Sequence, residues 1–477
     1  MAEEFMLLDL NEVGIGQLYW LLLDGNIGAR PFIRSHDNDG LHGRFYRRLL
    51  IFISIVAICV LKSISTWLER LGRFIEYWLN LWSHYDSFYM LVFNTLRGKN
   101  VELSREAAYF SSVIGLTDTR VELDDEIARD DPRYIGALAI MAAKTAYENK
   151  ARVKKIVEDH WKMEHLGFYD CTNAFDTTPE IEKDHPTQAF MFTDKTGDHD
   201  LICISFRGTS PLSADDWCTD LDISWFHLNG IGKVHAGFMK ALGLQKESQN
   251  KLSWPKEIES QTKDGEKLFA YYKIRQVLRE KLAENKNTRF MVTGHSLGGA
   301  LAVLFPAVLG YHKEFELLEK LEGVYTFGQP RVGDSEFCDF MKNLLGVESQ
   351  ERYFRFVYSN DIVPRIPFDH PDLLFKHFGY CYYFNSFYKG QVMNEEPNKN
   401  YFSARSIGPM HLNAIFELVR SAVLPYAFGR RYKEGILLFG VRIFGLLFPG
   451  VSAHCPQDYV NLTRLGSPDM FYTFQED

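Results

Sequence analysis

The segment 289–309 constrains the fold more strongly than any other part of the chain. A short apolar run, Arg289–Thr293, leads directly into Gly294-His-Ser-Leu-Gly-Gly-Ala300, and a second apolar run continues to Leu309. Glycines on both sides of a serine, between a strand and a helix, are typical of a sharp turn in which the strand and the helix pack closely. The segment therefore predicts a buried strand, a turn that exposes the Ser296 hydroxyl, and a helix over Leu297–Leu309.

Apolar runs of strand length alternate with helical patterns along the rest of the chain. Helical spacing is found over 134–161 and over Leu268–Leu282. The predicted strands are Gln188–Phe192, Leu201–Phe206, Arg289–Thr293, Gly323–Phe327 and Tyr353–Tyr358. Short apolar strands bounded by turn residues are typical of a sheet that helices cover on both faces. The expected fold class is therefore α/β with a mostly parallel central sheet.

A nucleophilic serine needs a histidine as general base and an acid that orients the histidine. After a turn of this kind, the acid and then the histidine follow the serine along the chain. Asp361 follows the strand Tyr353–Tyr358 and is the first candidate for the acid, whereas Asp334 has the position of a helix cap. Four histidines follow Asp361, and their order leaves the choice open: His370, His377, His411 and His454.

The turn and five further motifs resemble the class 3 lipases, an α/β-hydrolase family. The turn motif is Val292-Thr-Gly-His-Ser-Leu-Gly-Gly-Ala-Leu301, and the others are Ser205-Phe-Arg-Gly-Thr209, Asp216-Trp217 with Asp220-Leu221, Val234-His-Ala-Gly-Phe238, Tyr325-Thr-Phe-Gly-Gln-Pro-Arg-Val-Gly-Asp334 and Asn360-Asp361-Ile-Val-Pro364. The resemblance covers about 185–465, with an insertion at about 385–450. The N-terminal extension, the segment Ala142-Ala-Lys-Thr-Ala146 and the tail are similar to the plant oil-body triacylglycerol lipases.

The resemblance implies a role for each member of a catalytic triad. Ser296 is the expected nucleophile and Asp361 the expected acid. His454, in Ser-Ala-His-Cys-Pro-Gln-Asp-Tyr459, is the expected base, while His377 resembles a structural element of the family. The insertion between Asp361 and His454 leaves other histidines as alternatives.

The same resemblance implies the surroundings of the nucleophile. The N–H groups of Leu297 and Thr209 are expected to form the oxyanion hole, and an ordinary turn at 207–209 is the alternative. The nucleophile elbow is expected to depend on Gly294 and Gly298. The segment Ser210–Trp225 is the expected lid over the pocket, unless its aromatic side chains, Trp217 and Trp225, belong to the core.

The first 110 residues differ in composition from the rest of the chain. An apolar run over 49–61 precedes Lys62, and 49–68 is just long enough to cross a bilayer. Residues 41–75 contain six basic residues and one acidic residue, and nine aromatic residues lie between Trp67 and Phe93. Such combinations are typical of a membrane interface. We predict that 1–110 associates with a membrane or lipid droplet and that 111–477 forms the hydrolase domain, the alternatives being a bilayer crossing and a buried helical pair.

Two late apolar stretches, Leu412–Phe428 and Ile436–Pro449, are too ambiguous to assign from sequence. The second is too short to cross a bilayer. It is compatible with a core helix, a wall of an acyl groove or an element that dips into lipid.

The composition of the chain argues against several classes of binding partner. Lys and Arg number 53 against 62 Asp and Glu, so binding to nucleic acid through its phosphates is not expected. Seven scattered cysteines without a C-x-x-C pair indicate reduced thiols and the cytosolic side of a cell. The acidic run 124–131 lacks EF-hand spacing, and the chain contains no Walker A or dinucleotide loop. We therefore expect no metal and no cofactor.

The expected activity is hydrolysis of long-chain acylglycerols, triacylglycerol first, with release of free fatty acids. The expected location is the surface of a lipid droplet or the endoplasmic reticulum membrane, with lipid as the partner. A phospholipase A1 or galactolipase is the enzymatic alternative, and a catalytically inactive scaffold is the alternative of a different class.

Overall fold

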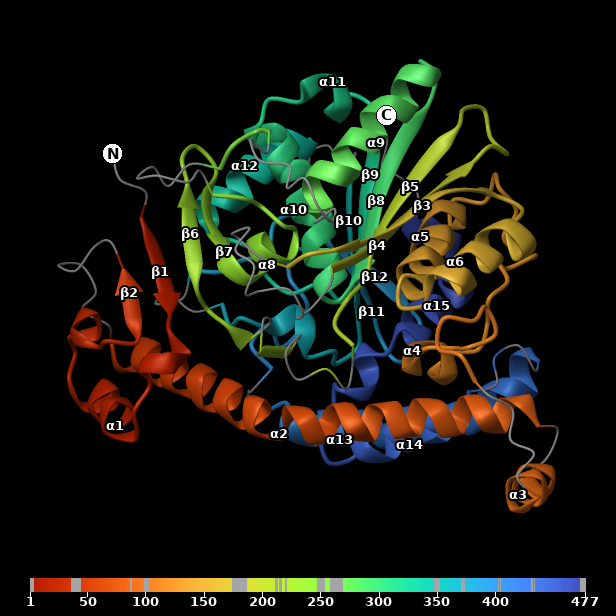
Figure 1. The fold of residues 1–477 in the computed structure, drawn as a ribbon, viewed down its shortest axis with the longest axis horizontal. Helices are drawn as coiled ribbons and strands as arrows, with labels where there is room; N and C mark the ends of the chain where they lie inside the picture. The colour runs from red at the N-terminus through yellow and green to blue at the C-terminus, as the bar shows by residue number, and fades with distance from the viewer. Residues whose placement is uncertain are drawn as a thin grey trace.

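A central sheet of eight strands, in the order β12-β11-β10-β9-β8-β5-β4-β3, carries the site (Figure 1). The structure is a computed structural model, and it describes residues 4–35, 44–85, 88–97, 103–173, 187–210, 213, 217–218, 221–246, 254–257, 269–346, 352–369, 374–401, 403, 405–429, 432 and 434–471. The strands are β3 (Glu164–Cys171), β4 (Thr187–Asp194), β5 (Leu201–Phe206), β8 (Arg289–His295), β9 (Leu321–Phe327), β10 (Tyr353–Tyr358), β11 (Cys381–Phe384) and β12 (Gly390–Met393).

The middle of this sheet is parallel and its margins are antiparallel. β5, β8, β9, β10 and β11 pair in parallel, whereas β3, β4 and β12 join through antiparallel pairs. All five strands expected from the sequence are present, and the expectation of an α/β fold with a mostly parallel sheet is confirmed.

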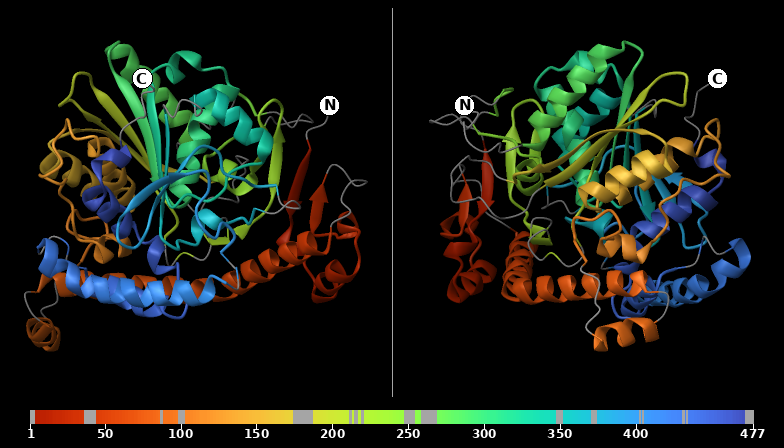
Figure 2. Two further views of the ribbon diagram at one scale, coloured as in Figure 1. Left: turned by 180° about the vertical axis from the view of Figure 1, so that it is seen from behind. Right: turned by 45° about the vertical axis from the view of Figure 1, so that its right-hand side comes forward.

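Helices cover both faces of the sheet, as Figure 2 shows from two further directions. The longer helices are α1 (Ile15–Leu23), α2 (Phe45–His84), α3 (Phe88–Leu96), α5 (Tyr134–Thr145), α9 (Ala270–Glu284), α10 (Leu297–Tyr311), α12 (Ser335–Leu345), α13 (Ile407–Phe428), α14 (Ile436–Gly445) and α15 (Pro456–Leu465). The shorter ones are α4 (Val113–Thr117), α6 (Lys150–Lys155), α8 (Ala236–Ala241) and α11 (Phe315–Leu318).

Two hydrophobic cores lie on the two faces of the sheet. Ile202 and Ile204 of β5 belong to the core that contains α8, α9, α10 and α12, while Leu201 and Cys203 belong to the core that contains α5 and α15. Alternate residues of a strand point to opposite faces, so a continuously apolar strand is buried on both sides.

The helical pattern over 134–161 is interrupted in the structure. α5 ends at Thr145, and α6 begins after Asn149, whose side chain accepts a hydrogen bond from the Arg152 N–H group. A π-helical turn, Ile156–His160, follows α6. Asparagine is a strong helix N-cap, which explains the new start within one apolar pattern.

The N-terminal strands complete a second, four-stranded sheet. β1 (Phe5–Leu8) pairs with β2 (Ile33–Ser35) and with β6 (Trp225–Leu228), and β6 pairs with β7 (Gly232–His235). The beginning of the chain is therefore joined by backbone hydrogen bonds to strands that lie more than 200 residues later.

α2 is one continuous helix that extends along one edge of the molecule beside α13 and α14 (Figures 1 and 2). Ile51, Ile55 and Ile58, spaced by four and three residues, are buried against the domain. The Ser54 hydroxyl donates to the Leu221 carbonyl, and the Cys218 thiol lies 3.9 Å from the Ile58 carbonyl. By length and composition, Phe45–Ser83 could cross a membrane, and 22% of its most apolar 18-residue window is buried.

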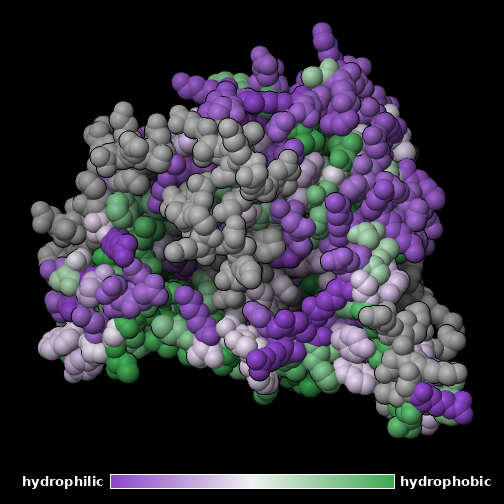
Figure 3. Space-filling view, viewed as in Figure 1, coloured by the Kyte–Doolittle hydropathy of each residue, from purple (hydrophilic) through white to green (hydrophobic). Residues whose placement is uncertain are grey.

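The outer side of α2 joins α13 and α14 in an apolar face. We give this name to the exposed side chains Ile53, Val60, Ile64, Trp67, Phe74, Trp78 and Trp82 of α2, Leu412, Ile415, Val419 and Val423 of α13, and Ile436, Phe439, Ile443 and Phe444 of α14. Figure 3 shows patches of hydrophobic residues along the lower edge, where Figure 1 places these helices, with hydrophilic residues between them. Large contiguous apolar surfaces mark sites of interaction.

Candidate active site

Ser296 stands at the turn between β8 and α10 with an uncommon backbone conformation. Its φ is 59° and its ψ is −132°, and its N–H group donates to the Phe327 carbonyl at 2.9 Å. A positive φ strains a residue with a side chain, and such strain is concentrated at functional sites. A Cβ on Gly294 would lie 2.1 Å from the carbonyl of Gly298, so only glycine allows this close approach.

The structure brings Ser296, His454 and Asp361 into one chain of hydrogen bonds. The Ser296 Oγ lies 2.8 Å from the His454 Nε2, and the His454 Nδ1 lies 2.8 Å from the Asp361 Oδ2. Asp361 follows the carboxyl end of β10, and His454 ends a short 3₁₀ helix before α15. Ser296 and Asp361 lie near each other because the parallel strands β8 and β10 end at the same edge of the sheet, and the segment before α15 brings His454 between them.

Asp361 has two further hydrogen-bond donors. The Val363 N–H group donates to Oδ1 at 2.9 Å, and the Tyr459 hydroxyl donates to Oδ2 at 2.5 Å. Burial, followed by the nearby Asp361 carboxylate, raises the pKa of Tyr459 well above its ordinary value, so the phenol keeps its proton. Sequence reasoning used Tyr459 only as the aromatic residue of the last motif and missed this contact.

His295, the residue before the nucleophile, holds the loop that carries His454. Its Nε2 lies 2.8 Å from the His454 carbonyl, and its Nδ1 lies 2.9 Å from the Tyr147 hydroxyl. Burial, together with the neighbouring His454, lowers the pKa of His295 well below its ordinary value. The neutral ring therefore donates from Nε2 to the carbonyl and accepts from Tyr147 at Nδ1. The sequence carried no signal for Tyr147.

The two expected oxyanion donors flank the nucleophile. Leu297 is the first residue of α10, where N–H groups point away from the helix and favour negative charge. Thr209 is buried, and the loop before it runs against the elbow, because a Cβ on Gly208 would lie 3.1 Å from the Ser296 Cβ.

A cavity of about 610 Å³ contains the Ser296 and His454 side chains. Its other lining residues come from α2 (Phe74, Ile75, Trp78, Leu79), α4 (Val113, Ile114, Thr117), α14 (Ile436, Leu437, Gly440, Val441, Phe444), the end of β8 (His295), the start of α15 (Pro456) and the segments between the longer elements (Tyr147, Thr209, Trp217, Ile362, Val363, Val451, Cys455). Trp217 thus reaches the cavity. Trp225 instead lies in β6 and packs in a core with Met6 and Ile33 of the N-terminal strands, away from the nucleophile.

The other candidates from the sequence lie elsewhere. Asp334 caps α12 by accepting from the Phe337 N–H group at 3.0 Å, and the His377 Nε2 lies 2.7 Å from the Pro364 carbonyl. His411 is on the surface of α13, with its Nδ1 2.8 Å from the Ile407 carbonyl. His370, like Asp216 and Asp220, lies outside the described residues. Within the described part of the chain, no cluster of His, Cys, Asp and Glu could hold a metal ion.

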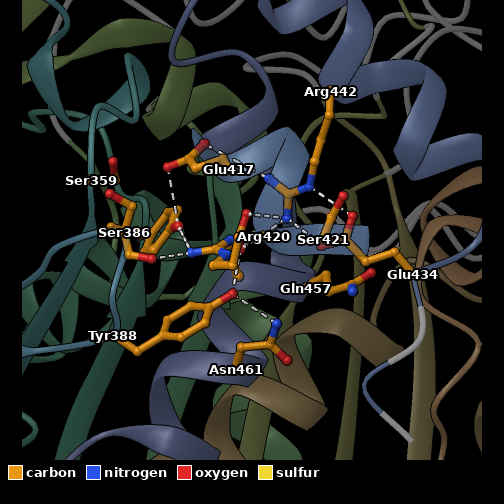
Figure 4. Close-up of polar contacts among 12 residues, drawn as sticks. Ser359, Ser386, Tyr388, Glu417, Arg420, Ser421, Glu434, Arg442, Gln457 and Asn461 are labelled. Atoms are coloured by element: carbon orange, nitrogen blue, oxygen red, sulfur yellow. Dashed lines mark hydrogen bonds and ion pairs between the residues drawn. The ribbon is translucent and has the colours of Figure 1, made fainter. Parts of the chain in front are cut away.

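A buried network of charged side chains joins α13 and α14 to α15 (Figure 4). Its centre is Asp458 of α15, which lies four residues after His454 in the sequence. Asp458 accepts from Tyr388 and Arg420 at 2.8 Å and from Arg442 at 3.1 Å, and Arg442 also donates to Glu434 at 2.6 and 2.7 Å. Burial raises the pKa of Glu434. Burial also acts to raise the pKa of Asp458, but Arg442 and Arg420 outweigh it and hold that pKa below its ordinary value. The network thus couples a wall of the cavity to the helix behind the histidine.

Known proteins resemble this chain over nearly its whole length. Residues 203–370 match the family described as lipase (class 3). The chain is 39% identical to triacylglycerol lipase OBL1 of Nicotiana tabacum over 93% of its own length and 88% of the relative's. It is 41% identical to triacylglycerol lipase OBL1 of Arabidopsis thaliana, with 88% and 85% covered, and 36% identical to that of Ricinus communis, with 94% and 91% covered. The chain belongs to the class 3 lipases, as the elbow and the motifs of the sequence indicated.

Proposed function

We propose that this lipase hydrolyses long-chain acylglycerols, triacylglycerol first, at a lipid surface. The observation that carries the proposal is the Ser296–His454–Asp361 chain, whose Ser296 and His454 line a cavity bordered by the apolar face. The three relatives named triacylglycerol lipase support the choice of substrate.

In the proposed reaction, His454 Nε2 takes the proton of Ser296 as Oγ attacks the ester carbonyl. The tetrahedral intermediate collapses when the bond to the alcohol oxygen breaks, and the leaving diacylglycerol takes the proton from His454. Water, deprotonated by His454, then attacks the acyl-enzyme, and the fatty acid leaves as Ser296 regains its proton. Asp361 keeps the histidine Nδ1 protonated and stabilises the imidazolium that forms. The N–H groups of Leu297 and Thr209 hold the oxyanion in both halves of the reaction.

The lining of the cavity favours an uncharged lipid. None of the described residues that border it is Lys, Arg, Asp or Glu. A phosphate or other charged headgroup would lose its hydration there without gaining a partner, which is costly. Triacylglycerol carries no such group, so we rank it above phospholipid.

The proposed location is a lipid droplet or the endoplasmic reticulum membrane, with the catalytic domain on the cytosolic side. Residues 1–110 supply α2, and α13 and α14 of the hydrolase domain extend the same apolar face. The exposed Lys62 and Arg70 of α2 suit an anionic lipid monolayer. The seven cysteines all lie in the described part of the chain, and none of them forms a disulfide bond there, which agrees with a reducing compartment.

The activity is tested with purified full-length protein on emulsified triolein, phosphatidylcholine and a galactolipid. We expect fatty acid release from triolein to exceed release from both polar lipids, and Ser296→Ala to abolish it. Preference for a polar lipid would favour the phospholipase or galactolipase alternative, and inactivity on all three would favour a scaffold.

Lipid attachment is tested by flotation of the full-length protein with triolein droplets coated by phospholipid. Trp67→Glu with Val419→Glu places two charges on the apolar face, outside the cavity, and we expect it to reduce flotation strongly. Phe315→Glu is the matched control, because Phe315 of α11 is 56% exposed, similar to Trp67 at 63%, but lies away from the face. Equal flotation of both variants would contradict this assignment.

A further inference from the structure

The residues that line the catalytic cavity are buried near Ser296 and become more exposed toward α2 and α14. Ser296 is 1% exposed and Thr117 is 3% exposed, whereas Phe74 of α2 is 58% exposed and Ile436 of α14 is 65% exposed. The cavity therefore runs from the nucleophile outward and opens between α2 and α14. These two mouth helices belong to the apolar face, so the opening is surrounded by apolar surface.

We infer that an acyl chain of the substrate enters through this opening, directly from the lipid phase, and that Gly440 of α14 keeps the passage open. The inference rests on the proposed lipase activity and adds the route and a residue that determines specificity. If the entrance lies within the lipid-facing surface, the acyl chain passes from lipid into the cavity without contacting water. This is favourable because exposing an apolar chain to water costs free energy. It also explains why an α/β-hydrolase domain is bordered by helices from both ends of the chain.

Gly440 is the position at which this route can be closed with least disturbance. It lines the cavity, and a Cβ built on it meets no atom within 4 Å. A larger side chain there extends into the open space of the mouth rather than into packed neighbours. Ile436 and Phe444, one helical turn before and after Gly440 on α14, also line the cavity and have large side chains. Gly440 therefore leaves an open space between them.

The α14 helix can act as such a wall because it is held firmly. Its Arg442 is 1% exposed and is bonded to Asp458 of α15 and to Glu434. The outer surface of α14 is apolar, whereas its inner side carries this buried charged contact. The wall therefore stays aligned with His454 while its outer side contacts lipid.

The test compares Gly440→Ala, Gly440→Trp and the control Gly408→Trp in the full-length protein. Gly408 lies in α13, also has no atom within 4 Å of a built Cβ, and is outside the cavity lining. Rates are measured with p-nitrophenyl esters from acetate to palmitate, and thermal melting reports folding. We expect Gly440→Trp to lower the palmitate-to-acetate rate ratio by about tenfold or more. Gly408→Trp should keep the wild-type ratio, and Gly440→Ala should lower it less than Gly440→Trp does.

An unchanged ratio in Gly440→Trp would overturn the proposed entrance, provided that the wild type hydrolyses palmitate. A wild type that cleaves none of the esters would refute the proposed function instead. A second readout is independent of turnover. A p-nitrophenyl phosphonate with a long alkyl chain bonds its phosphorus to the Ser296 Oγ as p-nitrophenolate leaves, and a diazirine on that chain marks its neighbours. We expect cross-links in 74–79 and 436–444, and cross-links confined to 221–246 would contradict the route.

Discussion

Replacing Arg442 by methionine should destabilise the lipase strongly, because it removes one of two buried cations from the network behind His454. Arg420 and Arg442 face three buried carboxyl groups, those of Glu417, Glu434 and Asp458. Burial raises the pKa of both Glu417 and Glu434, so the two arginines are what favours the ionised carboxylates in this network. Without Arg442, only Arg420 remains opposite the three carboxyl groups, so Glu434 must be neutralised or remain buried as an unpaired charge.

The magnitude follows from the loss of one partner of a buried ion pair. Such a loss costs about 3–5 kcal/mol, whereas removing both partners together costs much less. Each unit by which a carboxyl pKa must rise to become protonated adds about 1.4 kcal/mol. Arg442→Met with Glu434→Gln removes one cation and one carboxylate with little change in shape. We therefore expect the double variant to recover at least half of the stability lost in Arg442→Met.

The assay is urea unfolding followed by tryptophan fluorescence, with wild type, both single variants and the double variant as a double-mutant cycle. Glu434→Gln alone should destabilise the protein less than Arg442→Met, because Arg442 keeps Asp458 as a partner when Glu434 is neutral. An Arg442→Met midpoint equal to that of the wild type would refute the reasoning. So would a double variant that is no more stable than Arg442→Met.

Three further predictions concern the site, each measured by initial rates on a short-chain ester with thermal melting as a control for folding. His454→Ala should be as inactive as Ser296→Ala, and the double variant hardly worse than either, because the triad acts as a unit; additive losses would contradict this. Tyr459→Phe should lower kcat about tenfold, since a hydrogen bond to a charged group contributes about 1.5–3 kcal/mol; an unchanged kcat would remove Tyr459 from the support of Asp361. His295→Phe should also lower kcat, with little effect on KM, because the His454 carbonyl loses its donor; a change in KM alone would argue against a positioning role.

Elements whose formation depends on neighbouring residues could be predicted from the amino-acid sequence. The five apolar runs became strands, and the glycines around Ser296 predicted the elbow because their effect is local. Chain order and the strand before it indicated Asp361, whereas the family resemblance selected His454 among four histidines, and the structure brings both to Ser296. Asp334 caps a helix, as its position before a helical run indicated.

Tertiary structure alone decided which distant segments meet. The pairing of β1 with β6 buries Trp225 beside Met6, although its position after the Arg-Gly-Thr motif had suggested a lid. The contact of His295 with Tyr147 joins residues 148 positions apart, and no local pattern encodes it. Apolar stretches such as Ile436–Pro449 have the same composition in a core, in a groove wall or on a lipid-facing surface. Only the packing of α14 against α13 and α4, and the contact of its Arg442 with Asp458 of α15, shows which side is buried, because hydrophobic burial depends on area removed from water and not on sequence position.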